Sequence, residues 1–344
     1  MNRLVLWNGV IIKRRFVLLL IVLLLTLLWY GLVKYRPWDI IIPVAPALRK
    51  LPDYEFQQVV LRDVSGARTF YRISANTLTL DKTQGLLEQV TGSILENNNP
   101  VFDFIAQRGV LSVAKRTVTF QDFSGWTSGR FYPPWRIDSP LVYWDNTMQS
   151  FTFDKKPKLA SRDLLISASK IVYNQIFNFF LIGNDCEVRR GDYILQSDRA
   201  VLKNAIDVLT LEDNVALQGS SLNGRADLAD WDIRQDTVRL RNNVVVQTDD
   251  VVLTGTLVAL NSRQNTVQLQ GDVRLRSKSA TDDILVNTDR AVWNRQTEKI
   301  EFFENTRAWK NNSLIQSDQL VYDFAKKDVA ASGTGRTTII QTTE

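Results

Sequence analysis

The sequence predicts an all-β fold in which one amino-terminal transmembrane helix precedes an elongated array of stacked β-strands, in about nine repeats of ~29 residues. Three observations support this prediction. Residues 16–33 are apolar and uncharged, short alternating apolar runs begin near Leu51, and Val215, Val244 and Val273 recur at intervals of 29 residues. A fixed repeat of this length is typical of an array in which each unit buries its apolar face against its neighbours.

The composition excludes several classes of enzyme. The 344 residues include one Cys and no His, and the formal net charge is +5. Without His the chain lacks the usual general base, the Ser-His and Cys-His nucleophile pairs and the commonest zinc ligand. No GxxxxGK[ST] phosphate-binding motif occurs, and the Lys and Arg are scattered. We therefore expect a protein that is not an enzyme, that needs no cofactor or metal ion and that has no nucleic-acid partner.

The amino terminus has the pattern of a membrane anchor. As a helix, residues 16–33 would span roughly 27 Å, close to the thickness of a bilayer core. Basic residues at 13–15 precede this segment, so the positive-inside rule places the tail 1–15 in the cytoplasm. Residues 34–52 contain four Pro and are typical of a semi-rigid linker before a repeat domain at 53–340. The prediction is a single-pass protein of a bacterial inner membrane with its bulk in the periplasm; a cleaved signal peptide is the alternative.

Each repeat carries a fixed order of residue types. We call Val215, Val244, Val273 and the equivalent residue of every other unit the repeat anchor. Apolar residues occur six and four positions before each repeat anchor, as Leu209 and Leu211 do before Val215. Each unit also has a large apolar or aromatic residue thirteen positions before its repeat anchor. The residue that follows this large residue is Asp or Asn in seven of nine units, and Asp and Asn tolerate turn geometry. We expect a strand that ends on a large residue, an Asx turn, a second strand, a polar bend such as 212–214, and a third short strand. The large residues, thirteen before each anchor, are Leu80, Leu111, Trp144, Tyr173, Leu202, Trp231, Leu260, Trp293 and Tyr322.

Period-two alternation within the strands predicts one dry face and one wet face. Leu209 and Leu211 point to one side, and Thr210 and Glu212 point to the other. Stacked units align the apolar positions into one continuous stripe. This stripe could be the filled core of a solenoid or the lining of an open groove, and periodicity does not separate the two.

The repeat motif resembles the OstA/LptA/LptC family of the lipopolysaccharide export bridge. The resemblance rests on a recurring form, Ser197-Asp198-Arg199-Ala200-Val201-Leu202 and Thr288-Asp289-Arg290-Ala291-Val292-Trp293, and on the Val/Leu-x-Leu-x-x-Asn-Val runs at 209–215 and 238–244. The anchor segment is similar to that of the LptC member, although this array is longer than usual for that member. The resemblance implies an open, twisted β-jellyroll of stacked antiparallel strands, whose apolar interior shields the acyl chains of lipopolysaccharide.

Twelve apolar residues are candidates for a lipid-binding lining if that resemblance holds. The alternative for each is an ordinary core residue. They are Phe151, Phe153, Phe180, Ile182, Leu209, Leu211, Val238, Leu240, Val267, Leu269, Ile300 and Phe302.

The expected partners follow from the same resemblance and from strand edges. Besides lipopolysaccharide, we expect an inner-membrane ABC transporter that supplies the work and faces the first units. The β-prone segment 336–343 is expected to offer its edge to a periplasmic bridge protein of the same fold, because unpaired strand edges recruit other strands. A frayed terminus is the alternative.

Charged side chains and the cysteine are weaker candidates for sites. Lys155, Lys156, Lys158 and the pair 189–190 could meet lipid phosphates, although solvated turns are the simpler interpretation. The acidic pairs 249–250 and 282–283 fall in expected turns, and Cys186 occupies an apolar position typical of a small core residue. Two other functions compete with lipid conduction: a membrane-tethered structural or adhesive β-solenoid, and, less favoured, a β-solenoid enzyme that acts on polysaccharide.

Overall fold

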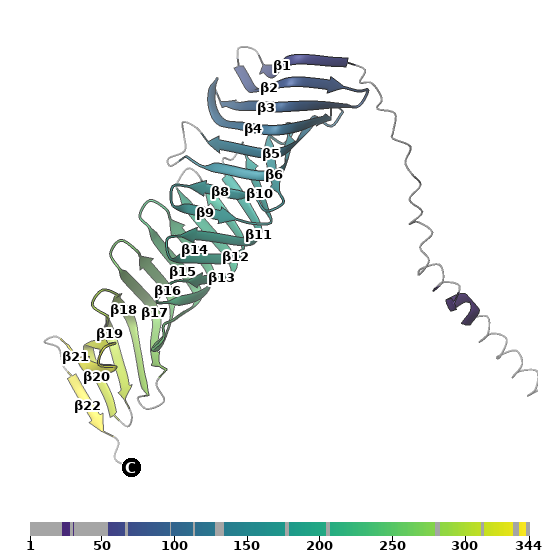
Figure 1. Ribbon diagram of the computed structural model, residues 1–344. Helices are drawn as coiled ribbons and strands as arrows, with labels where there is room; N and C mark the ends of the chain where they lie inside the picture. Colours follow the sequence, from purple (N-terminus) through teal and green to yellow (C-terminus); the bar gives the residue numbers. More distant parts are fainter. Residues whose placement is uncertain are drawn as a thin grey trace, which may run out of the picture. The chain divides into compact units, whose positions relative to one another are not determined.

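The computed structural model describes residues 23–27, 30, 54–65, 68–96, 98–112, 114–127, 134–175, 179–203, 207–278, 283–310, 313–332 and 337–341. From Pro52 onward the chain is one unit, in which the described residues form a single 22-stranded antiparallel sheet (Figure 1). Each strand pairs with strands that are near it in the sequence, so the all-β array of stacked antiparallel strands is confirmed.

The strands are β1 (Tyr54–Ser65), β2 (Arg68–Leu80), β3 (Gln84–Glu96), β4 (Asn99–Ser112), β5 (Thr117–Thr127), β6 (Arg136–Asp145), β7 (Ser150–Asp154), β8 (Lys158–Ser161), β9 (Leu164–Ser167), β10 (Lys170–Asn174), β11 (Phe179–Arg190), β12 (Tyr193–Lys203), β13 (Val208–Gln218), β14 (Asn223–Asp232), β15 (Thr237–Gln247), β16 (Val251–Asn261), β17 (Thr266–Ser277), β18 (Ile284–Asn294), β19 (Lys299–Lys310), β20 (Ser313–Asp323), β21 (Asp328–Ala331) and β22 (Thr337–Gln341).

The strands of the regular part are interrupted in the middle by a β-bulge. In β13, residues 208–212 pair with β14, the ladder then skips Asp213 and Asn214, and residues 215–218 resume the pairing. The two skipped residues have φ of 64° and 53°. Asn, Asp and Gly adopt this left-handed conformation more readily than other residues, which is why they recur at the bulge. The corresponding pairs are Asn184 and Asp185, Asn242 and Asn243, Gly271 and Asp272, and Glu304 and Asn305.

The prediction of a third short strand is therefore wrong for these units. The polar bend is a bulge inside one strand, so the second and third predicted strands are a single strand of about eleven residues, as β13 shows. The chain does break at this position between β7 and β8, where Lys155 and Lys156 both have φ of 62°.

The bulges divide the sheet into two arms. The first arm contains residues 208–212 and their counterparts, and the second arm contains residues 215–218 and theirs. Alternate residues are buried in both arms: Leu209 and Leu211 in the first, Val215 and Leu217 in the second. One core cluster contains the buried residues of both arms. The two arms therefore face each other and share one interior.

The predicted Asx turns are confirmed at the end of the first-arm strands. The Asp232 carboxylate accepts a hydrogen bond of 2.8 Å from the backbone N–H of Gln235, and Asn261 accepts one of 3.0 Å from Gln264. Asn294 accepts two such bonds, from Gln296 and Thr297. These bonds satisfy backbone donors that the ladder leaves unpaired, so the sequence column of Asp and Asn marks the tight reversals.

The membrane-spanning helix is the part of the fold prediction that the structure contradicts. Helical residues are described at 23–27 and 30 only, and no helix among the described residues is long and apolar enough to cross a membrane. The other positions of 16–33, the tail 1–15 and the linker 34–52 lie outside the described residues.

Candidate functional site

The twelve predicted lining residues lie on the inner face of the first arm. The strands β7, β11, β13, β15, β17 and β19 supply two residues each, at positions i and i+2 that the pleat places on one side. Eleven of the side chains are 0% exposed, and Val238 is 6% exposed. The residues are Phe151, Phe153, Phe180, Ile182, Leu209, Leu211, Val238, Leu240, Val267, Leu269, Ile300 and Phe302.

The candidate list missed the opposite wall of the interior. The second arm presents its own buried apolar residues to the same core, at exposures of 0–1%. The sequence carries this signal in part, at the residue two positions after each repeat valine: Leu217, Val246 and Leu275. The missed residues include Leu159, Ile166, Val188, Leu195, Leu217, Val246, Leu253, Leu275, Val286 and Ala308.

Side chains of the two arms meet directly in the first units. The ring of Phe102, in the second arm, lies 5.4 Å from the ring of Phe151 and 5.7 Å from that of Tyr173, both in the first arm. The rings of Phe104 and Phe123 stack 5.2 Å apart beside them. The interior of these units is therefore filled by the protein's own aromatic side chains.

The interior also holds polar atoms without hydrogen-bond acceptors. Within the described residues, the indole N–H groups of Trp144, Trp231 and Trp293 are buried and unpartnered. All three occupy the large position at the end of a first-arm strand. Cys186 is 1% exposed, which confirms it as a core residue, and burial raises the pKa of its thiol to about 12.

Side chains close the seam along which the rims of the two arms meet. Arg190 of the second arm forms an ion pair of 2.9 Å with Asp236 of the first. Arg295 of the first arm donates to the hydroxyl groups of Tyr193 and Ser221 in the second, the latter at 2.7 Å. Strand pairing, as far as the described residues show it, runs along the array and does not join these rims. Among the described residues, side-chain contacts and not a backbone ladder therefore hold this seam.

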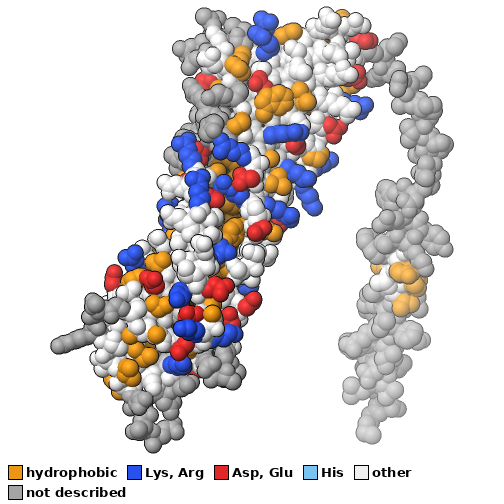
Figure 2. Space-filling view, turned by 60° about the vertical axis from the view of Figure 1, so that its left-hand side comes forward, with side chains coloured by type: hydrophobic (Ala, Val, Ile, Leu, Met, Phe, Trp, Pro, Cys, Tyr) orange, Lys and Arg blue, Asp and Glu red, His pale blue; other side chains and the backbone are white. Residues whose placement is uncertain are grey.

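The surface side chains singled out in the sequence do not form one cluster. Lys155 and Lys156 are exposed at the break between β7 and β8, and Arg189 pairs with Glu187 at 2.5 Å. Asp250 pairs with Lys327 at 2.7 Å across the seam. Figure 2 shows Lys and Arg interspersed with Asp and Glu over the visible face, so this face has no single-sign field.

Two family models match the part of the chain that contains the regular units. Residues 165–266 match the model described as LptA/(LptD N-terminal domain) LPS transport protein, and residues 223–339 match the model of OstA-like protein. These matches support the OstA/LptA family. They run from β9 to β22 and include the Ser-Asp-Arg-Ala-Val-Leu motif at 197–202.

The comparisons with solved and curated proteins carry no further argument for the family. This chain shares 20% sequence identity with LptH, for which a crystal structure is known. LptH is described as the LptA homologous periplasmic component of the conserved lipopolysaccharide transport device from Pseudomonas aeruginosa. The similarity covers 36% of this chain and 95% of LptH, with a TM-score of 0.33. No curated protein matches the chain.

Proposed function

We propose that this OstA/LptA-like chain carries lipopolysaccharide across the periplasm by shielding its acyl chains between the two arms of the array. The observation that carries the proposal is the continuous dry interior, in which both arms contribute side chains that are almost wholly buried. Each methylene that leaves water contributes about 0.8 kcal/mol, so an interior of this kind lowers the cost of moving a lipid through an aqueous space. One matching family model describes an LPS transport protein and the other an OstA-like protein, which supports a role in transport.

Lipid uptake by this mechanism requires the interior to open. The bulged strands are held by backbone ladders along the array, whereas the seam is held by side chains such as Arg190 and Arg295. Separation of the two rims therefore breaks fewer and weaker interactions than separation of two strands. Acyl chains would enter along this seam and replace contacts between the arms.

The finer proposal concerns position and partners. We place the array at the periplasmic side of a bacterial inner membrane, like the LptC-type members, where an ABC transporter for lipopolysaccharide supplies the work. In the described residues β1 pairs only with β2, and β22 pairs only with β20. The exposed Tyr54 and Phe56 on β1 and Ile339 and Ile340 on β22 add apolar surface at these edges. Such edges fit strand pairing with the transporter complex and with a bridge protein of the same fold.

The alternative function is a structural or adhesive β-solenoid without lipid transfer. One observation favours it: the rings of Phe102 and Phe151 already fill the interior of the first units. A solenoid whose core is filled needs no ligand for its stability.

Site-specific photo-crosslinking separates the two functions. A benzophenone side chain would replace Leu211 or Phe302 in the interior, and Glu301 and Gln218 on the outer face would serve as matched controls from the same strands. Lipid transport predicts crosslinks to lipopolysaccharide in cells from the interior positions only, and the crosslinks should depend on ATP. Absence of lipid crosslinks from every interior position would support the solenoid instead.

A further inference from the structure

A pocket at the seam lies among arginine side chains from both arms. Its volume is about 370 Å³. The sequence drew attention only to Arg190 among its residues, because the others are far apart in the chain. The lining residues are Ser161, Arg162, Asp163, Arg190, Ile233, Arg234 and Arg263.

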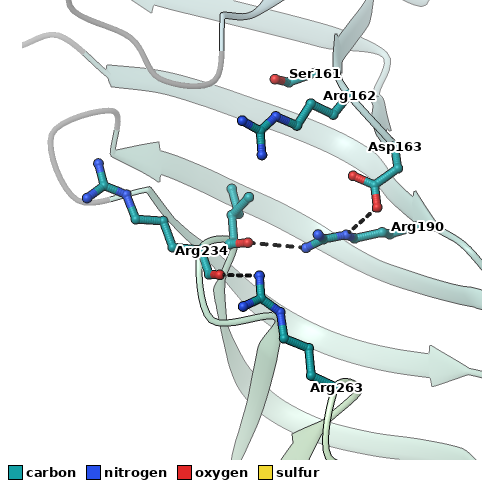
Figure 3. Close-up of a pocket in the computed structure, with 7 residues that line it drawn as sticks. Ser161, Arg162, Asp163, Arg190, Arg234 and Arg263 are labelled. Carbon is teal, nitrogen blue, oxygen red and sulfur yellow. Dashed lines mark hydrogen bonds and ion pairs between the residues drawn. The ribbon is translucent and has the colours of Figure 1, made fainter.

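Three guanidinium groups converge on this pocket. Figure 3 shows Arg162 and Arg190 reaching in from one side and Arg263 from the other, while the side chain of Arg234 extends away. Arg263 is held by a hydrogen bond of 2.8 Å from its guanidinium to the backbone carbonyl of Arg234. The side chain of Arg234 pairs with Asp207. The convergence therefore depends on turns that are distant in sequence and fixed by the fold.

Carboxylates balance part of this positive charge. Arg190 pairs with Asp163 at 2.9 Å and with Asp236 at 2.9 Å. The hydrogen bond from Arg190 also holds the pKa of Asp163 below its ordinary value. The lining of the pocket thus contains four arginines and one carboxylate, Asp163, while Asp236 meets Arg190 from outside the lining.

The pocket adjoins the apolar interior. Arg190 stacks over the ring of Trp231 at 5.8 Å, and Trp231 is 1% exposed. The indole N–H of Trp231 has no hydrogen-bond acceptor within the described part of the chain. An amphiphile lying across this rim would place its apolar part in the interior and its polar part among the arginines.

We propose that this pocket binds the phosphate group of a phosphorylated amphiphile as its acyl chains enter the seam. The proposal rests on the proposed function and extends it to the headgroup. A planar guanidinium donates two parallel hydrogen bonds to a phosphate, and several converging guanidinium groups recognise an anion more strongly than single surface cations do. Free inorganic phosphate has the same chemistry, so the test must distinguish the two sources.

The test uses the full chain and three probes: inorganic phosphate, a diphosphorylated lipid A in detergent, and the same lipid without phosphates. The variants are Arg162→Gln, Arg263→Gln and their combination, and Arg239→Gln on the outer face of β15 is the matched control for loss of one charge. We expect the combined variant to bind the phosphorylated lipid about tenfold more weakly, a loss of about 1.4 kcal/mol, because it no longer donates these charged hydrogen bonds to the phosphate. Its affinity for the lipid without phosphates and the control's affinity for all three probes should not change.

Two results would overturn the proposal. One is equal affinity of the wild-type protein for both lipids, which would leave at most a site for free phosphate. The other is unchanged binding of the phosphorylated lipid by the combined variant. If that variant does not fold, the wild-type protein is tested for competition between inorganic phosphate and the phosphorylated lipid. The absence of competition would count against phosphate binding in the pocket. Failure of the proposed function is distinguishable, since it abolishes interior crosslinks to lipid and leaves phosphate binding intact.

Discussion

Arg295 donates a hydrogen bond of 2.7 Å to the hydroxyl of Ser221, which lies in the opposite arm and 74 residues earlier in the chain. The same guanidinium contacts Tyr193, whose ring it also stacks over at 5.8 Å. One side chain thereby joins the rim of the first arm to two places on the rim of the second. Such side-chain contacts close the seam, and no backbone ladder among the described strands does so.

Replacement of Arg295 should loosen the seam without disturbing the strands. We expect Arg295→Met to lower the free energy of unfolding by about 1–2 kcal/mol, because two hydrogen bonds and one cation–π contact are lost. The measurement is the midpoint of thermal unfolding, and Arg307→Met on the outer face of β19 is the control. A midpoint shift equal to that of the control would show that the seam contact contributes nothing to stability.

The bulge in β13 requires a residue that tolerates positive φ. Asn214 has φ of 53° and donates a hydrogen bond of 2.6 Å to the Asp198 carboxylate. Asn214→Val should destabilise the fold by about 1–3 kcal/mol, since a β-branched residue is strained in this region.

Asn214→Gly provides the comparison for that variant. It loses the same hydrogen bond but fits the backbone, so it should be less destabilising than Asn214→Val. Urea denaturation measures both, and equal losses would contradict a role for backbone conformation.

A cavity variant tests the packing between the arms. Leu211 is 0% exposed, so Leu211→Ala should cost about 2–5 kcal/mol of stability. Gln218→Ala, on the exposed side of the same strand, should stay within about 0.5 kcal/mol of the wild type. Denaturant midpoints at matched protein concentration give both values. A small effect of Leu211→Ala would mean that the interior is loosely packed at this level.

The thiol of Cys186 should be unreactive in the folded protein. Burial raises its pKa from 9.0 to about 12, so at pH 8 the thiolate is scarcer in the folded state than in the unfolded state. Because the folded pKa is the higher one, the contribution of this group to stability is full below pH 9 and is lost as the pH rises toward 12. A maleimide reagent at pH 8 should label the protein only after denaturation. Fast labelling of the native protein would indicate that the array opens near β11.

The sequence contained the repeat, the turns and the dry face because each depends on local chemistry. The Asp and Asn after the large position form the turns at Asp232, Asn261 and Asn294. The residues of the bend at Asp213 and Asn214 predict a boundary between two strands equally well, since the same residue types favour turns and bulges. Only the continued pairing with β14 on both sides of the bend reveals a single strand.

The sequence alone predicts only the wall of the candidate site that the first arm forms. Residues such as Leu209 and Leu211 follow from alternation, and Leu217 obeys the same rule in the second arm. What alternation does not show is that the bulge turns the second half of the strand to face the first. The ion pair of Arg190 with Asp236 forms only because the second arm faces the first, and the same holds for the approach of Arg162 and Arg263 to one pocket. The spacing of these residues in the sequence does not predict either arrangement.

The sequence separation of the residues that meet across the seam has a consequence for how the array tolerates changes in length. Along the ladder a unit contacts its immediate neighbours, so the loss of one 29-residue unit would leave every remaining strand with a partner. Across the seam Arg295 contacts a residue 74 positions away, more than two units distant. A whole-unit deletion between them would therefore change which residues meet across the seam while preserving the sheet. The contacts across the seam therefore require a particular order of units and not only a particular number of them. The units of this array are not interchangeable.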